Sequence, residues 1–266
     1  MAGCGAEYLV MTSSMLKLFL EDPALVDKYV ADLDSVGLSF LDSHAPFGAD
    51  WDLNCFCEER HAELIELHKK SMRIAANAGV RTMTFHIGND FIQPEIPESA
   101  HLERVCRMLD VLLAEAEKLH MTLAIENSWT KFAAVDNLLK IKALYPVKEL
   151  GFCFDSGHAN IMDNGRLYPD SPAYETWNPM NIKVPQWEDC TLEKLLDNVT
   201  VCHLHDNNGS ADQHDLPGRG NVDWDKIIKL LEKAPRLMAI QSETSMERNN
   251  ISPQQLVGTF RQMFEC

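Results

Sequence analysis

The sequence predicts an α/β fold, a TIM-type barrel in which parallel strands alternate with helices. Seven short apolar runs recur along the 266 residues, and helix-length amphipathic segments separate them. Buried parallel strands read as short apolar runs, and this alternation continues without a linker rich in Gly, Ser or Pro. Chains of this length often form such a barrel as one unit. We therefore expect a single barrel domain over residues 1–266.

Six of the seven predicted strands end in a side chain that can bind a metal ion. The apolar runs are residues 6–11, 38–44, 80–86, 123–126, 152–155, 201–203 and 238–243. From the second run onward, the terminal residues are His44, His86, Glu126, Asp155, His203 and Glu243. In a β/α barrel the chemistry lies at the carboxyl ends of the strands. Packing alone does not explain six such residues at one rim, so the pattern indicates a metal site in the barrel mouth.

The predicted helices fall between these runs, at residues 23–36, 58–78, 97–119, 134–144, 191–197, 224–233 and 253–264. In the longer segments apolar residues recur every three or four positions, which is typical of a helix with one buried face. Gly79 supplies a stop after the second helix. Residues 163–189 form the longest stretch without a periodic pattern, directly after the strand that ends at Asp155. We expect a functional loop there, on the active rim.

The number of predicted strands is one short of the eight that close a barrel of this type. Either the barrel is incomplete, or a short segment replaces its first strand. A missing strand leaves two edges with unpaired backbone N–H and C=O groups. We expect the edge strands at residues 6–11 and 237–241 to be covered. Direct pairing of the two strands would do this, and so would a neighbouring chain, which would make the protein an oligomer.

Composition and charge disfavour several classes of protein. No stretch approaches about 18 uninterrupted apolar residues, so no membrane span is expected. The first residues lack the basic start and apolar core of a signal peptide. The eight scattered cysteines are typical of reduced thiols rather than a disulfide framework, so we expect a cytoplasmic protein. The formal net charge of −16 repels nucleic-acid phosphates.

Close pairs of polar side chains lie near the same strand ends. These pairs are Asp155 with His158, His203 with His205, and Asp212 with His214. Two Glu, one Asp and one His make an oxygen-rich set suited to Mn²⁺, Mg²⁺ or Co²⁺, and additional His ligands favour Zn²⁺. Two carboxylates that face each other across a bound substrate also suit removal of a proton beside a carbonyl.

Several motifs together resemble the xylose-isomerase-like TIM-barrel superfamily. The motifs are Phe85-His86-Ile87-Gly88, Ile125-Glu126-Asn127, Asp155-Ser156-Gly157-His158, His203-Leu204-His205-Asp206 and Gly218-Arg219-Gly220. The resemblance runs from about residue 4 to the C-terminus. The superfamily contains sugar and sugar-phosphate isomerases and epimerases, and also endonuclease IV.

In the isomerase and epimerase branch, the resemblance implies one divalent ion (Mn, Mg, Co or Zn) held by Glu126, Asp155, His203 and Glu243. Glu126 and Glu243 would also be the catalytic residues that move a proton between sugar carbons through a metal-stabilised enediolate. The residues predicted to contact substrate are His44, His86, His158, His205, Asp212, His214 and Arg219. The predicted function is therefore that of a metal-dependent isomerase or epimerase of a small sugar or sugar derivative.

The alternative is a zinc-dependent, endonuclease IV-like phosphodiesterase that acts at abasic sites in DNA. That branch uses nine zinc ligands, and each has a counterpart here: His44, His86, Glu126, Asp155, His158, His203, Asp212, His214 and Glu243. Two departures disfavour it. Arg219 stands where the family usually has Glu, and the missing first strand removes a loop that the nuclease would use on DNA. We therefore expect a small sugar, rather than nucleic acid, as the partner.

Overall fold

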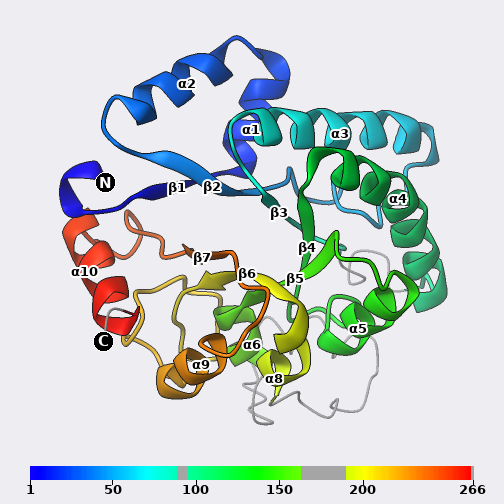
Figure 1. The fold of residues 1–266 in the computed structure, drawn as a ribbon. Coiled ribbons are helices and arrows are strands. Elements are labelled where there is room, and N and C mark those ends of the chain that lie inside the picture. The colour runs from blue at the N-terminus through cyan, green and yellow to red at the C-terminus, as the bar shows by residue number, and fades with distance from the viewer. Residues whose placement is uncertain (89–94, 163–189, 265–266) are drawn as a thin grey trace.

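The sheet of the computed structural model contains seven parallel strands, paired in the order of the sequence from β1 to β7. The strands are β1 (Tyr8–Met11), β2 (Ser39–His44), β3 (Thr82–Phe85), β4 (Thr122–Glu126), β5 (Leu150–Asp155), β6 (Val199–Leu204) and β7 (Ala239–Ser242). The sheet curls into a nearly closed barrel, which confirms the predicted TIM-type fold (Figure 1). The structure describes residues 1–88, 95–162 and 190–264, so the predicted functional loop at residues 163–189 lies outside the described part.

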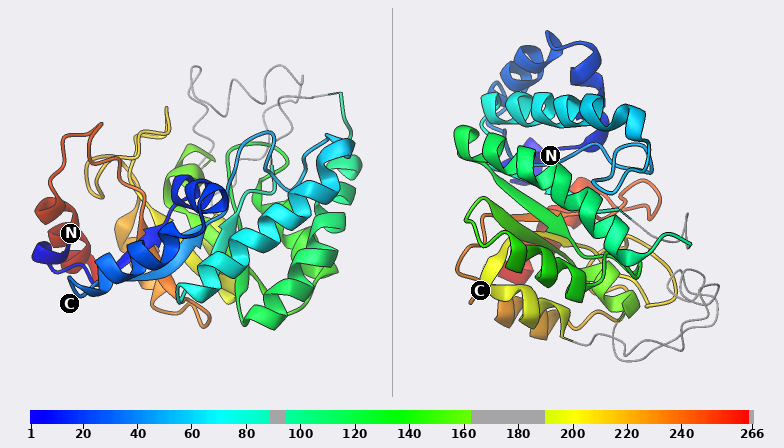
Figure 2. Two further views of the ribbon diagram at one scale, coloured as in Figure 1. Left: turned by 90° about the horizontal axis from the view of Figure 1, so that it is seen from above. Right: turned by 90° about the vertical axis from the view of Figure 1, so that its right-hand side faces the viewer.

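Helices cover the outside of this sheet, and Figure 2 shows α3 and α4 lying against each other there. The α-helices are α1 (Ser13–Glu21), α2 (Leu25–Asp34), α3 (His61–Asn77), α4 (Glu98–Leu119), α5 (Val135–Leu144), α6 (Ser156–Met162), α8 (Thr191–Leu195), α9 (Trp224–Leu231) and α10 (Pro253–Phe264). Short 3₁₀ turns are η1 (Ala2–Cys4), η2 (Glu58–Arg60) and η5 (Leu196–Asn198). The sequence did not predict α1 and α6. In the described ranges no helix has the length and apolarity to span a membrane.

Local signals explain where several helices begin and end. Thr12 caps α1, because its side chain accepts a hydrogen bond from Met15 N at 3.3 Å. Asp223 caps α9 in the same way, by accepting from Lys226 N at 3.0 Å. After α3, Gly79 adopts a φ of 95°, and Val80 N then bonds back to the Ala75 carbonyl at 3.0 Å. The left-handed conformation ends the helix as the sequence predicts.

Two apolar layers hold the barrel together. The larger one lies between the strands and the surrounding helices and includes Phe19, Phe85 and Phe152. The smaller one fills the inside of the barrel with Ala124, Cys153, Val201 and Ala239. These inner residues alternate along their strands with outward-facing ones, as the period of two requires. They form a floor beneath the polar side chains at the carboxyl ends.

The predicted direct pairing of the two edge strands is wrong. β1 and β7 are the outer strands of the sheet, and no backbone hydrogen bond joins them in the part of the chain that is described. A barrel of eight strands leaves an interior just wide enough for side chains. Closing seven strands would narrow an interior that already holds buried polar groups such as Asp42 and His203. Below the gap, Arg261 of α10 donates to the Gly5 carbonyl at 3.0 Å and ties η1 to α10 (Figure 1).

Coverage of the gap by a neighbouring chain stays a prediction. Tyr8, Met238 and Ile240 lie on the edge strands or next to them and are 51%, 44% and 37% exposed. Because open apolar edges favour association, we expect a dimer by sedimentation analysis, and Tyr8→Lys together with Ile240→Lys should dissociate it. A wild-type chain that sediments as a monomer would show that a second copy does not cover the gap.

His68 gives the fold a measurable dependence on pH. This side chain is fully buried in α3, and one ring nitrogen, Nε2, lies 2.8 Å from the Trp51 carbonyl. Burial lowers the pKa of His68 from 6.5 to about 4. The unfolded chain therefore binds this proton first as the pH falls, so stability contributed by neutral His68 is present above pH 6.5 and is lost toward pH 4. Full loss corresponds to about 3 kcal/mol.

Replacing His68 by Gln should flatten this dependence, because Gln keeps an N–H donor for Trp51 and does not titrate. Urea unfolding at several values between pH 4 and pH 6.5 measures the free energy of unfolding for both proteins. The exposed His120, which has a φ of 52°, supplies the control as His120→Asn, because Asn tolerates this conformation. Equal slopes for wild type and His68→Gln would contradict the assignment.

Candidate metal centre and active site

The strand ends bring the predicted ligands to one end of the barrel. His44, Glu126 and Asp155 are the last residues of β2, β4 and β5, and His203 is the next-to-last residue of β6. His86 and Glu243 follow directly after β3 and β7. Neighbouring strands place these residues at the same height along the barrel axis; Asp155, for example, is in register with His203. Side chains from six strands therefore meet in the barrel mouth, as the sequence predicts.

Glu126, His203 and Glu243 form the centre of the site. His203 Nδ1 lies 3.0 Å from Glu126 Oε1 and 3.0 Å from Glu243 Oε1. The other ring nitrogen, Nε2, lies 3.3 Å from Thr84 Oγ1, which fixes the ring. Burial alone would raise the pKa of Glu243, but the adjacent His203 outweighs it and lowers that pKa to about 2. Burial would also raise the pKa of Glu126, and His203 again holds it well below its usual value.

His44 and His86 approach the other oxygen of Glu126. His86 Nε2 lies 3.0 Å and His44 Nε2 lies 3.5 Å from Glu126 Oε2. Asp52 stands behind His86, with 3.9 Å between Asp52 Oδ1 and His86 Nδ1. His44 Nδ1 donates to the Ala45 carbonyl at 2.9 Å, so its Nε2 faces the glutamate. This second group of donor atoms shares Glu126 with the first.

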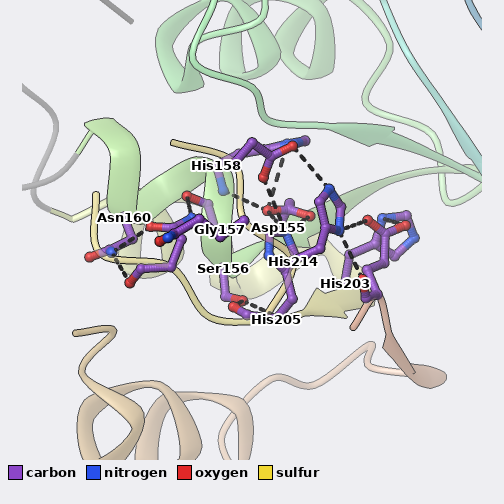
Figure 3. Close-up of polar contacts among 12 residues, drawn as sticks. Asp155, Ser156, Gly157, His158, Asn160, His203, His205 and His214 are labelled. Atoms are coloured by element: carbon purple, nitrogen blue, oxygen red, sulfur yellow. Dashed lines mark hydrogen bonds and ion pairs between the residues drawn. The ribbon is translucent and has the colours of Figure 1, made fainter. Parts of the chain in front are cut away.

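A third group of donors lies beside Asp155, as Figure 3 shows for the labelled residues. His205 Nε2 lies 3.2 Å from Asp155 Oδ1, and His158 N–H donates to the same oxygen at 2.6 Å. Asp212 Oδ2 lies 2.9 Å from His214 Nε2 and 3.8 Å from His158 Nε2. Burial would lower the pKa of His214, but the Asp212 carboxylate raises it to about 9. His158 Nδ1 lies 3.7 Å from Glu126 Oε1 and joins this group to the centre.

One cavity of about 370 Å³ opens onto these groups. His44, His86, Asp212 and His214 line it together, as the sequence predicts. Glu126, His158 and Glu243 also line it, whereas the fully buried Asp155 and His203 lie beneath. Two aromatic walls complete the cavity. The ring centroid of Phe47 lies 4.6 Å from that of His86, and the ring centroid of Trp129 lies 4.7 Å from that of His158. An apolar wall with a polar floor is typical of a small-molecule site.

Two predicted substrate-binding residues do not line the cavity. His205 is fully buried and stacks beneath His214 at 4.0 Å between ring centroids. Arg219 points to Asp215, with 3.5 Å between Nη1 and Oδ1, and it does not line the cavity. His205 follows the end of β6 and is buried because Asp155 and His214 pack against its ring. Arg219 lies on a turn beyond the rim. The geometry does not support substrate contact by either residue.

Sequence reasoning missed several residues that shape the site. Phe47, Asp52 and Trp129 line the cavity, but none of them ends a predicted strand. Their place in the site is visible only once the loops that carry them are folded. Asp206, which follows His205, shapes the site through its loop. Its buried carboxylate accepts from Gly218 N at 2.8 Å and from Trp224 Nε1 at 2.9 Å, and so holds the loop that carries Asp212 and His214. The signal available for Asp206 is its position three residues after the strand-end His203.

The fold and the site together define a barrel whose mouth gathers His, Asp and Glu side chains that could hold a metal ion. The family description "Xylose isomerase-like TIM barrel" matches residues 2–255. The chain belongs to this family, which confirms the resemblance drawn from its motifs.

Solved structures of similar fold include a D-tagatose 3-epimerase-like protein, with a TM-score of 0.70 and 20% identity over 97% of this chain and 86% of the other. The 3-keto-D-glucoside 4-epimerase YcjR from E. coli has a TM-score of 0.69 and 14% identity over 99% and 91%. The IOLI protein with a bound zinc atom has a TM-score of 0.67 and 16% identity over 98% and 88%. At these identities the likeness shows the fold.

Two curated relatives carry no assigned activity. The uncharacterized protein y4fM of Sinorhizobium fredii is 27% identical over 71% of this chain and 55% of its own length. The uncharacterized protein MJ1311 of Methanocaldococcus jannaschii is 28% identical over 78% and 64%. The matches thus span 55% and 64% of the length of these relatives.

Proposed function

We propose that this protein is a divalent-metal-dependent isomerase or epimerase of a small sugar or sugar derivative. The observation that carries the proposal is the meeting of two glutamates at one histidine nitrogen, His203 Nδ1, beside a cavity of about 370 Å³. Isomerisation and epimerisation beside a carbonyl require groups that remove and return a proton. Two carboxylates that reach one cavity from strands β4 and β7 supply them.

The donor set fits a divalent cation. His203 Nδ1 carries at most one proton and lies 3.0 Å from both Glu126 Oε1 and Glu243 Oε1. Gln241 Nε2 donates to Glu243 Oε1 at 3.1 Å, whereas the buried Glu126 Oε2 has no aligned donor in the described part of the chain. A cation is the natural partner for such crowded acceptors. We assign Glu126, Asp155, His203 and Glu243 as ligands, a set suited to Mn, Mg, Co or Zn. When bound, the ion supplies Lewis acidity that polarises a carbonyl and makes the adjacent C–H more acidic.

The protein side chains do the rest of the chemistry. Glu126 Oε1 or Glu243 Oε1 removes the proton from the carbon beside the carbonyl. The other glutamate then returns a proton, either to the former carbonyl carbon, which isomerises the sugar, or to the opposite face of the same carbon, which inverts it. His44, His86, His158, Asp212 and His214 line the cavity and hold substrate hydroxyl groups. Phe47 and Trp129 pack on the apolar face of the sugar and exclude water. The solved epimerases of similar fold support the assignment of a sugar substrate.

Proton exchange in D₂O tests this proposal directly. The purified protein is analysed for metal and then incubated with a panel of free and phosphorylated ketoses and aldoses in D₂O, followed by NMR. We expect about one divalent ion per chain, a new sugar isomer, and deuterium at the carbon beside the carbonyl. Metal-loaded protein that exchanges no proton in any sugar of the panel would refute the proposal.

The endonuclease IV-like phosphodiesterase remains the second candidate, because the third group of donors lies beside the first. His158 Nδ1 is 3.7 Å from Glu126 Oε1, and His214 Nδ1 is 3.9 Å from Glu243 Oε2. Three ions per chain would favour it. With 24 basic residues against 40 acidic ones, the chain repels a phosphate backbone. We therefore expect no incision of an abasic-site duplex. Incision at low enzyme concentration that Glu243→Gln abolishes would instead support the phosphodiesterase.

A further inference from the structure

Asn127 stands directly after Glu126, where β4 ends. Its buried side chain makes two hydrogen bonds to the main chain of Asp155 on the neighbouring strand. Asp155 N donates to Asn127 Oδ1 at 2.9 Å, and Asn127 Nδ2 donates to the Asp155 carbonyl at 3.0 Å. The last registered pair of these two strands is Glu126 with Cys153. The side-chain amide therefore extends the β4–β5 ladder past the point where its backbone register ends.

A carboxamide suits this task because it offers a donor and an acceptor, like a peptide group. An Asp side chain would offer only acceptors and would place an oxygen against the Asp155 carbonyl. A Gln side chain would be one methylene too long. Asp155 itself is fully buried, so the position of its main chain decides where its carboxylate lies.

The same residue also orients His158. His158 Nδ1 donates to the Asn127 carbonyl at 2.9 Å, which leaves Nε2 directed toward Asp212 and the cavity. On the opposite side of this turn, Ser156 Oγ donates to the His205 carbonyl at 2.8 Å and accepts from His205 N at 3.0 Å. Figure 3 shows Asp155 and the first residues of α6, with Ser156 beside His205. Asn127 is thus the anchor on the β4 side.

We propose that Asn127 is a positioning residue that sets Asp155 and His158 in the geometry required for metal and substrate binding. The inference rests on the proposed function, since it assumes a divalent ion at Asp155. Partners that orient the direct ligands of a metal ion typically contribute 10–100-fold to metal affinity. Asn127 bonds the main chain of Asp155 rather than its carboxylate, so it fixes the position of the whole residue.

Cobalt binding tests this inference without an activity assay. The wild-type apoprotein, Asn127→Ala and Asn127→Asp are titrated with Co²⁺, and the visible absorption band of the bound ion is recorded. We expect both variants to bind Co²⁺ at least about tenfold more weakly, with an altered band. Asp adds a negative charge that would attract the cation, and Ala does not. Weaker binding in both variants therefore ties the effect to geometry rather than to charge.

Asn137→Ala is the matched control. Asn137 is also buried, but its side chain accepts from Lys140 Nζ at 2.8 Å on helix α5. This variant should lose thermal stability and keep the wild-type Co²⁺ affinity and spectrum. Equal affinities for wild type and both Asn127 variants would overturn the inference, and so would an equal loss in Asn137→Ala or a failure of both Asn127 variants to fold. Absence of Co²⁺ binding by the wild type would refute the proposed function instead.

Discussion

Replacing Glu243 by Gln is expected to lower kcat for sugar isomerisation by about 10³-fold or more. Gln keeps the size of the side chain but cannot accept a proton from carbon. The change also removes a carboxylate that lies 3.0 Å from His203 Nδ1, so the candidate metal loses a ligand. Both consequences act on the same step, because the base and the cation serve the same carbonyl group.

The measurement separates these two causes. Metal content is determined together with kcat and with the rate of deuterium incorporation in D₂O. If the ion stays bound while exchange stops, the lost group is the base. If high metal concentration restores exchange, the loss came from the weakened metal site. Glu247→Gln, four residues further on and exposed, should leave kcat unchanged. A kcat for Glu243→Gln within about threefold of wild type would contradict the assigned role of Glu243.

The strands and their polar ends were predictable from the sequence because each depends on a short, local pattern. A buried parallel strand needs only a continuous apolar run, and each of the seven runs became a strand. The candidate ligands could be expected at the same end of the barrel, because the carboxyl ends of parallel strands share one rim. Helix α3 ends at Asn77, two residues before the predicted glycine, for an equally local reason, the left-handed conformation of Gly79.

Other features depend on contacts between distant residues and were not predictable. Helix α1 follows β1 at once, and its Thr12 cap carries too weak a signal to separate it from the preceding strand. The sequence could not show that the His205 ring stacks on that of His214. The period of two tells which face of a strand a side chain is on, but not what covers that side chain. The role of Asn127 exists only because Asp155, 28 positions away, lies on the adjacent strand. The open gap between β1 and β7 likewise depends on how far seven strands curl.

Stripping the protein of divalent metal with a chelator is expected to abolish turnover and also to lower the melting temperature. Without a cation, the carboxylates of Glu126, Asp155 and Glu243 crowd around the buried rings of His203 and His205 in the barrel mouth. An ion present at a thousand times its Kd stabilises the folded state by about 4 kcal/mol, and its removal reverses this.

Reloading the apoprotein with Mn²⁺, Co²⁺, Mg²⁺ or Zn²⁺ should restore both activity and melting temperature, in proportion to occupancy. Glu247→Gln should respond to the chelator like the wild type, because this exposed side chain lies away from the donors. Glu243→Gln should show a much smaller change in melting temperature, since it binds the ion weakly from the start. Full turnover by protein that holds far less than one ion per chain would exclude a metal requirement. The two glutamates would then act without Lewis-acid assistance, and the crowding of acceptors at His203 would need a proton, not a cation, to explain it.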